Sequence, residues 1–146
     1  MPHLEALLLE IQRFCTIVPK AIPHYTKTAT TVKGYDIPDN TFVIFNLHAV
    51  HRCQDTFDDA DVFRPERFLT LDGRFERHPH VIPFGLGKRS CLGELLATQE
   101  VFLFTAALIQ NFKFKRENEM KLSEDGVMGF TLGPKAFKVK AIPREM

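Results

Sequence analysis

The chain has 146 residues, of which 45% are hydrophobic and 25% are charged, a composition typical of one globular domain and not of a disordered segment. Its 19 basic and 18 acidic residues are mixed along the chain and leave a net charge of +1. This balance argues against a nucleic-acid partner and against binding to an anionic membrane surface.

The three cysteines, Cys15, Cys53 and Cys91, are an odd number at wide spacings. They fit neither a disulfide framework nor a CxxC zinc pattern, so we expect a reducing, intracellular compartment. No apolar run approaches the roughly 20 residues of a membrane span, and the first residues lack the basic and apolar regions of a signal peptide. We therefore expect this chain to carry no membrane anchor of its own.

Residues 2–15 are predicted to form a helix. Apolar side chains recur there at helical spacing, and the proline at position 2 is tolerated in a first helical turn. Pro19 and Pro23 prevent the helix from continuing.

A small β region is predicted next. Residues 28–32 are rich in β-branched side chains and lead into turn-like sequences at 33–34 and 37–40. Residues 41–46 are apolar enough to form a strand buried on both faces. A short helix or turn is expected at 47–53.

The second half of the chain alternates between irregular and regular segments. Residues 54–83 show no sustained periodicity and predict a long irregular stretch, which inside a compact domain is usually functional. Residues 94–110 return to a helix that is apolar nearly all round in its second half and is expected to be buried. Alternating side chains at 111–115 and 136–140 predict two half-buried closing strands around the turn-rich segment 117–135.

Cys91 ends a glycine-rich loop directly before the last predicted helix. Gly85, Gly87 and Gly93 would let the backbone approach a flat macrocycle closely, because glycine has no side chain and tolerates unusual backbone angles. At a helix N-terminus, free N–H groups and the helix dipole lower the pKa of a thiol and hydrogen-bond its sulfur. The segment therefore has the features of a loop that supplies an axial thiolate.

Two phosphate-binding motifs fail on the same loop. A Walker motif needs a glycine where Ile82 stands and Ser or Thr after Lys88, where Arg89 stands. The dinucleotide motif GxGxxG fails because Ser90 takes the place of its third glycine and no clean strand leads into the loop.

Two other interpretations of Cys91 stay open on the residues alone. A lone cysteine beside a glycine turn is often just a small buried residue. A nucleophilic Cys–His enzyme is also possible. The histidines that could serve it are His24, His48, His51, His78 and His80.

Three motifs in order resemble the cytochrome P450 family. Residues 84–93 match its haem-binding signature, FxxGxRxCxG, at every fixed position. Residues 10–13 resemble its ExxR helix motif, and residues 63–68, Phe-Arg-Pro-Glu-Arg-Phe, resemble its PERF segment. The amino-acid sequence around these motifs is similar to that of the animal microsomal (family 2-like) class, which oxidises steroids, fatty acids and foreign compounds.

The resemblance implies an α+β, mainly helical fold, namely the C-terminal part of the cytochrome P450 fold, with residues 1–146 forming a single partial domain. It implies haem b as cofactor, a small apolar organic substrate, an NADPH-dependent reductase as partner, no nucleic acid, and a parent protein in the endoplasmic reticulum membrane. It also implies that the long distal helix, whose acid–threonine pair delivers protons to oxygen, lies outside these residues. We therefore expect weak or no monooxygenase activity from this chain alone; the alternative is an inactive haem-binding or interaction remnant.

The resemblance also assigns cofactor-binding residues. Cys91 would be the catalytic thiolate ligand of the iron, Arg89 would bind one haem propionate, and His24 would give a second propionate contact. Phe84 would pack on the ligand side of the haem and shield the sulfur. Gly85 and Gly93 would allow the close approach of the loop to the cofactor.

A structural triad is implied as well. By spacing alone, Glu10 and Arg13 would form a surface ion pair worth a few tenths of a kcal/mol. The resemblance instead implies that Glu10, Arg13 and Arg67 pin the irregular stretch against the first helix and so hold the cysteine loop. The chain departs from the family after Arg52, where Asp-Pro is usual and Cys53 and Gln54 stand instead.

Overall fold

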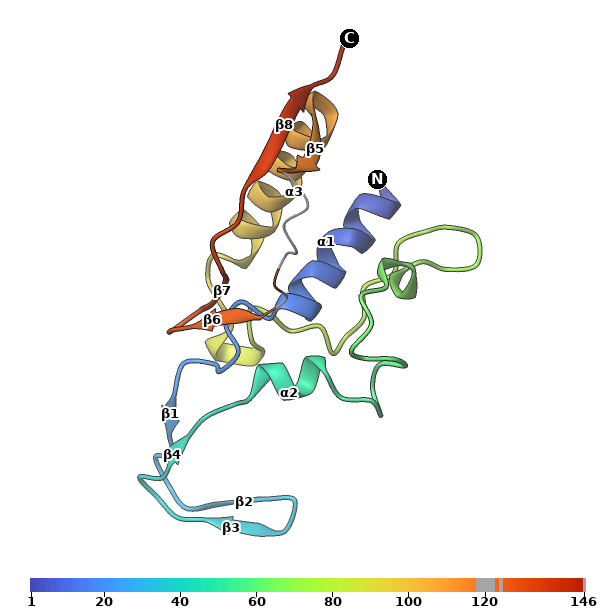
Figure 1. Ribbon diagram of the computed structural model, residues 1–146. Helices are drawn as coiled ribbons and strands as arrows, with labels where there is room; N and C mark the ends of the chain where they lie inside the picture. The colour runs from blue at the N-terminus through green and yellow to red at the C-terminus, as the bar shows by residue number, and fades with distance from the viewer. Residues whose placement is uncertain (118–122, 124, 146) are drawn as a thin grey trace.

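The computed structural model describes residues 1–117, 123 and 125–145, and its elements follow one another as Figure 1 shows. The helices are α1 (Pro2–Cys15), α2 (Leu47–His51) and α3 (Glu94–Asn111), with short 3-10 helices at Pro65–Phe68 and Gly87–Arg89. The strands are β1 (His24–Tyr25), β2 (Thr30–Val32), β3 (Tyr35–Ile37), β4 (Phe42–Val43), β5 (Phe112–Arg116), β6 (Gly126–Met128), β7 (Leu132–Pro134) and β8 (Val139–Pro143).

The described strands form four separate two-stranded antiparallel sheets, which pair β1 with β4, β2 with β3, β5 with β8 and β6 with β7. The β2–β3 hairpin turns through Lys33 and Gly34, which both have positive φ, at 49° and 84°. Two positive φ angles in a two-residue loop match the twist of the flanking strands, and glycine adopts them without strain. Three helices with small antiparallel sheets agree with the predicted α+β class.

The first helix has the predicted bounds. Proline at position 2 lies in its first turn, where the missing N–H breaks no helical hydrogen bond. The helix ends at Cys15, and the next residue, the C-cap Thr16, has the left-handed φ of 39° and an N–H that donates to the Gln12 carbonyl at 3.2 Å. A β-branched residue at positive φ is strained, so its neighbours must hold it there.

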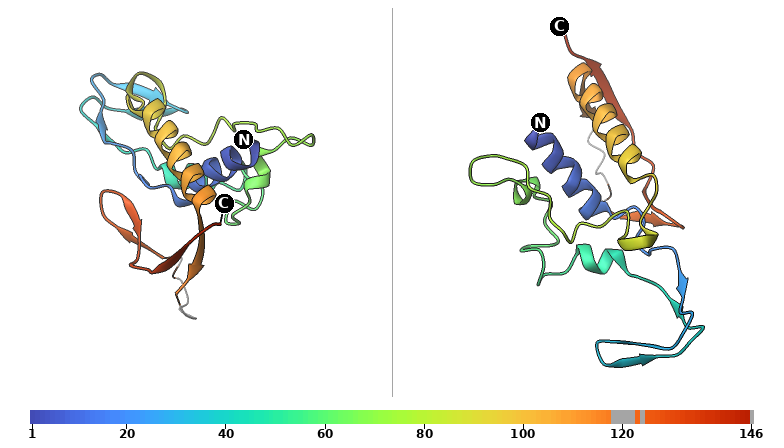
Figure 2. Two further views of the ribbon diagram at one scale, coloured as in Figure 1. Left: turned by 90° about the horizontal axis from the view of Figure 1, so that it is seen from above. Right: turned by 180° about the vertical axis from the view of Figure 1, so that it is seen from behind.

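The buried core lies between α1 and the irregular stretch that follows α2. Figures 1 and 2 show this stretch, with its 3-10 helix, lying along one side of α1 while α3 lies along another. The long irregular segment is therefore ordered by packing on a helix. The core cluster consists of Ala6, Leu9, Phe57, Ala60, Phe68 and Val81.

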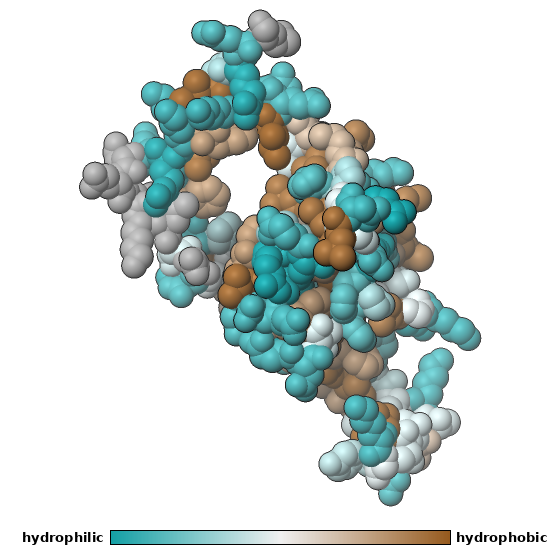
Figure 3. All heavy atoms as spheres, turned by 90° about the vertical axis from the view of Figure 1, so that its right-hand side faces the viewer, coloured by the Kyte–Doolittle hydropathy of each residue, from teal (hydrophilic) through white to brown (hydrophobic). Residues whose placement is uncertain are grey.

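The prediction that the last helix is buried is wrong for the described chain. None of the residues of α3 is buried, and Leu103 and Phe104 are 63% and 66% exposed. An open hollow of about 510 Å³ between α1 and α3 shows that the two helices do not pack closely. Apolar composition reports which side chains avoid water, but not whether a partner element covers them. Figure 3 accordingly shows hydrophobic residues, in brown, reaching the surface.

Two strand predictions also need correction. The strand expected at 41–46 reduces to β4, and it is not buried on both faces, because Phe42 and Phe45 are 51% and 53% exposed. The closing strands β5 and β8 do pair, but β8 begins later than predicted and both are mostly exposed instead of half-buried. The turn-rich segment contains the β6–β7 hairpin; residues 118–122 and 124 of that segment lie outside the described residues.

Within the described residues, none of the helices combines the length and the apolar character needed to cross a bilayer.

Candidate functional site

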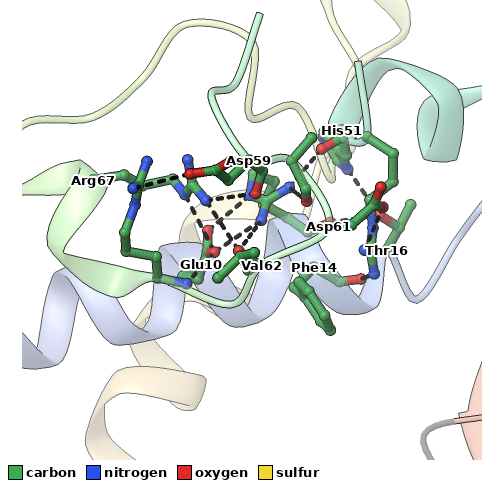
Figure 4. Close-up of polar contacts among 12 residues, drawn as sticks. Glu10, Phe14, Thr16, His51, Asp59, Asp61, Val62 and Arg67 are labelled. Atoms are coloured by element: carbon green, nitrogen blue, oxygen red, sulfur yellow. Dashed lines mark hydrogen bonds and ion pairs between the residues drawn. The ribbon is translucent and has the colours of Figure 1, made fainter. Parts of the chain in front are cut away.

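A fully buried ion pair stands at the centre of the polar contacts in Figure 4. Arg13 donates from Nε to Oε2 of Glu10 at 2.7 Å and from Nη2 to Oε1 at 2.8 Å, a two-pronged contact between side chains that are both 0% exposed. Their i, i+3 spacing places them on one face of α1, and the irregular stretch covers that face. The surface ion pair that spacing alone suggested is therefore wrong.

The same guanidinium also binds main-chain carbonyls of distant segments. Arg13 Nη1 donates to the carbonyls of His51 and Ala60 at 2.7 and 2.8 Å, and Nη2 approaches that of Val62 at 3.4 Å. Arg13 thereby makes five hydrogen bonds through a planar group with five N–H donors, whereas a lysine has three donors and no planar fork to match a carboxylate. Arg13 thus joins α1, the end of α2 and the irregular stretch.

Glu10 receives further donors from the 63–68 segment. Its Oε1 accepts the main-chain N–H of Arg64 at 2.8 Å and Nε of Arg67 at 3.3 Å. Burial raises the pKa of Glu10, but the hydrogen bonds from Arg13 and Arg64 outweigh it and hold the pKa below its usual value. The carboxylate therefore stays ionised inside the fold.

Arg67 completes the cluster, so the structure brings all three predicted triad residues together. Its Nε donates to Oε1 of Glu10, and the rest of its guanidinium satisfies backbone groups of the irregular stretch. The carbonyls that it binds, at 2.7 to 3.2 Å, are those of Asp58, Asp59 and Val62.

His51 is a fully buried polar residue that the sequence did not single out. It appeared only among candidate partners of a nucleophilic cysteine, yet it is 0% exposed and both ring nitrogens are hydrogen-bonded. Burial first, and then the nearby charges of Arg13 and His48, lower the pKa of His51 from 6.5 to about 4. No sequence signal beyond its place at the end of a short helix could have identified it.

The cysteine loop is closed by one short main-chain contact. The Cys91 N–H donates to the Phe84 carbonyl at 2.8 Å, and the 3-10 helix at 87–89 lies between them. Gly85 and Gly87 take the left-handed φ angles of 77° and 72°, which glycine adopts without strain. Cys91 is a free, exposed cysteine, two residues before the Gly93 N-cap of α3.

Gly93 keeps space open beside the sulfur. A Cβ at this position would lie 3.8 Å from Cys91 Sγ, in van der Waals contact with it. In the described residues, the thiol of Cys91 makes no hydrogen bond to a histidine, and no group of three metal-ligating side chains is present. Nothing in this geometry supports a Cys–His nucleophile.

Two of the predicted cofactor contacts are cationic or polar groups without partners. Arg89 is exposed at the end of the 3-10 helix, and its side chain makes neither a hydrogen bond nor an ion pair with the described residues. His24 packs edge-on against Phe45 at 5.6 Å, and its Nδ1 is buried with no hydrogen-bond partner among the described residues. Phe84 is half-buried. Among the described residues, no hydrogen bond, ion pair or aromatic contact joins His24 to the cysteine loop.

Comparison with known proteins gives consistent matches along the chain. The family model described as "Cytochrome P450" matches residues 1–141. The chain is 40% identical over 144 residues to cytochrome P450 2J1 of Oryctolagus cuniculus, covering 99% of this chain and 28% of that protein. It is 42% identical over 145 residues to cytochrome P450 2U1 of Rattus norvegicus, with 99% and 27% covered. The chain thus spans little more than a quarter of the length of these relatives.

Replacing Arg13 by methionine tests the buried pair. We expect the free energy of unfolding to fall by about 3–5 kcal/mol, because Glu10 would remain buried without its principal partner. Urea unfolding of Arg13→Met measures this loss. The matched control is Arg74→Met, which removes an exposed pair with Asp72 and is expected to change stability little. Equal losses in the two variants would contradict this account of the cluster.

The low pKa of His51 predicts a pH-dependent stability. The unfolded chain protonates this ring near pH 6.5 and the folded chain only near pH 4, so unfolding takes up a proton between these values. Stability is therefore complete above pH 6.5 and falls by about 3 kcal/mol as the pH drops to about 4. Urea unfolding across this range should show the slope in the native chain and a shallower one in His51→Gln. Identical slopes would be the contrary result.

Proposed function

Because the chain belongs to the cytochrome P450 family, which binds haem through a cysteine thiolate, we propose that Cys91 is this ligand. We further propose that residues 1–146 are the C-terminal haem-binding portion of a haem-thiolate monooxygenase. The observation that carries the proposal is the exposed thiol of Cys91 at the junction of a glycine loop and α3.

The residues present fit a haem group. Gly85 and Gly87 adopt left-handed angles that keep side chains out of the loop, and Gly93 leaves the flank of the sulfur open. The guanidinium of Arg89 and the buried Nδ1 of His24, which have no polar partners within the described part of the chain, are suited to two negatively charged propionates.

The chain's own residues would prepare the ligand. Cys91 lies just before the N-terminus of α3, where the helix has no side-chain cap and main-chain N–H groups are available to hydrogen-bond a sulfur ligand. Phe84 accepts the N–H of Cys91 and so fixes the backbone that carries the sulfur. The chemistry that haem supplies when bound is dioxygen activation, which a thiolate ligand promotes by pushing electron density toward the O–O bond.

The triad would act on structure and not on substrate. Glu10, Arg13 and Arg67 fasten the irregular stretch to α1, and this stretch leads directly into the cysteine loop. We propose that retention of haem is the functional consequence of this cluster.

We extend the proposal to the whole protein on the strength of its relatives. Its reaction would be the insertion of one oxygen atom into a small apolar organic molecule, such as a steroid, a fatty acid or a foreign compound. Electrons would come from an NADPH-dependent reductase, and the protein would reside at the endoplasmic reticulum membrane.

A second candidate, a haem-binding or interaction remnant without turnover, has one observation in its favour. The apolar side chains of α3, such as Leu103 and Phe104, are exposed in the described chain, and the hollow of about 510 Å³ between this helix and α1 is open to solvent. Product formed from a generic apolar substrate by this chain, with reductase and NADPH, would exclude the remnant.

Substitution of Cys91 tests the ligand assignment. The chain is reconstituted with haemin, reduced and exposed to carbon monoxide, and the Soret band is recorded. A thiolate ligand gives a strongly red-shifted band, so we expect this band in the native chain and its loss in Cys91→Ser.

Cys15→Ser is the matched control, because Cys15 is also free and exposed but lies at the end of α1. It should keep the red-shifted band. Persistence of the band in Cys91→Ser, or its absence from the native chain, would overturn the assignment.

A further inference from the structure

His51 forms a bridge between two segments that are far apart in the sequence. Its ring lies at the end of α2, fully buried, with Nδ1 3.0 Å from the hydroxyl of Thr16 just after α1 (Figure 4). On the other side, Nε2 accepts the main-chain N–H of Ile82 at 2.9 Å. The ring therefore connects the end of the first helix to the segment that enters the cysteine loop.

The hydrogen bonds fix which nitrogen carries the proton. A main-chain N–H can only donate, so Nε2 of His51 must be unprotonated to accept from Ile82. The Thr16 hydroxyl donates its hydrogen bond to the Arg13 carbonyl at 2.7 Å, so toward His51 its oxygen accepts from Nδ1. His51 is thus the neutral Nδ1–H tautomer, with every polar atom in a defined role.

Ile82 is the first fixed point of the cysteine loop. Its N–H is held by His51, and its carbonyl accepts the N–H of Gly85 at 3.0 Å. The intervening Pro83 has no N–H to offer. The loop that starts from this turn is closed by the contact between Cys91 and Phe84. The backbone that carries the sulfur is therefore anchored at one end by a histidine ring.

The anchor is itself tied to the buried ion pair. Arg13 donates from Nη1 to the main-chain carbonyl of His51 at 2.7 Å, while Glu10 holds the other edge of the same guanidinium. The charged groups that act on the His51 ring are Arg13 and His48. One continuous polar network therefore runs from α1 through His51 to the entrance of the loop.

We propose that His51, as the Nδ1–H tautomer, is a positioning residue that sets the Cys91 loop for thiolate ligation by holding the N–H of Ile82. The inference rests on the proposed role of Cys91. It adds a residue that acts on the ligand through the backbone and touches neither haem nor substrate.

Three substitutions of His51 distinguish its hydrogen bond to Ile82 from mere filling of the buried site by the ring. In His51→Gln, the side-chain oxygen can reach the position of Nε2 and still accept from Ile82. In His51→Asn, the shorter amide can reach Thr16 but not Ile82, and His51→Leu fills the space with no hydrogen bond. The matched control is His48→Gln, an exposed histidine of the same helix.

The first measurement is the ratio of unshifted to red-shifted Soret bands in the reduced carbon monoxide complex of the haemin-reconstituted chain. Leaving a buried donor unpaired should raise this ratio roughly tenfold in His51→Asn and His51→Leu. His51→Gln should stay close to the native ratio, and His48→Gln should match it. Equal ratios in all His51 variants would overturn the inference while leaving Cys91 as the ligand.

The second measurement is ¹⁵N NMR of the histidine rings in the native chain, which reports the tautomer without haem or activity. We expect His51 as Nδ1–H, and an Nε2–H signal would overturn the inference even if the Asn and Leu variants fail to fold. Absence of a red-shifted band from the native chain would instead refute the proposed role of Cys91, and this inference would fall with it.

Discussion

The two-pronged contact between Arg13 and Glu10 fastens the irregular stretch to α1. It is made inside one helix, at i, i+3 spacing, but it is buried because the remaining N–H groups of the arginine hold carbonyls from segments 38 and 47 residues away. A buried charge pair has a desolvation cost that is offset only when such additional hydrogen bonds are made. The cluster is therefore complete only when the irregular stretch is in place.

This explains how a largely irregular segment, whose helical structure is one short 3-10 helix in the described chain, holds a defined path. Its carbonyls need partners when they are buried, and guanidinium groups of Arg13 and Arg67 supply them where a neighbouring strand otherwise would. Apolar anchors such as Phe68 then fix the stretch on α1. The same path delivers Ile82 to the ring of His51, so that the helix, the irregular stretch and the cysteine loop form one connected unit.

Local features of this fold were predictable from the residues, and features that depend on distant partners were not. The helix at 2–15 and the turn at 33–34 follow from proline, glycine and spacing, and they stand where they were predicted. The burial of Glu10 could not be predicted from its i, i+3 spacing to Arg13, because a segment more than fifty residues away in the sequence covers it. The prediction that Phe104 on α3 is buried was wrong, because burial depends on whether a distant segment covers the side chain. The role of His51 depends on contacts with Thr16 and Ile82, which no periodicity encodes.

In the proposed arrangement, the buried contact between Arg13 and Glu10 holds, through His51, the loop that carries Cys91. Amide hydrogen exchange in Arg13→Lys tests it most directly, because lysine keeps the charge but loses the planar set of donors. We predict that the N–H groups of Ile82 and Cys91 exchange faster in this variant, although neither residue contacts Arg13 directly. Faster exchange confined to α1, with the amides of Ile82 and Cys91 as protected as in the native chain, would contradict the claim.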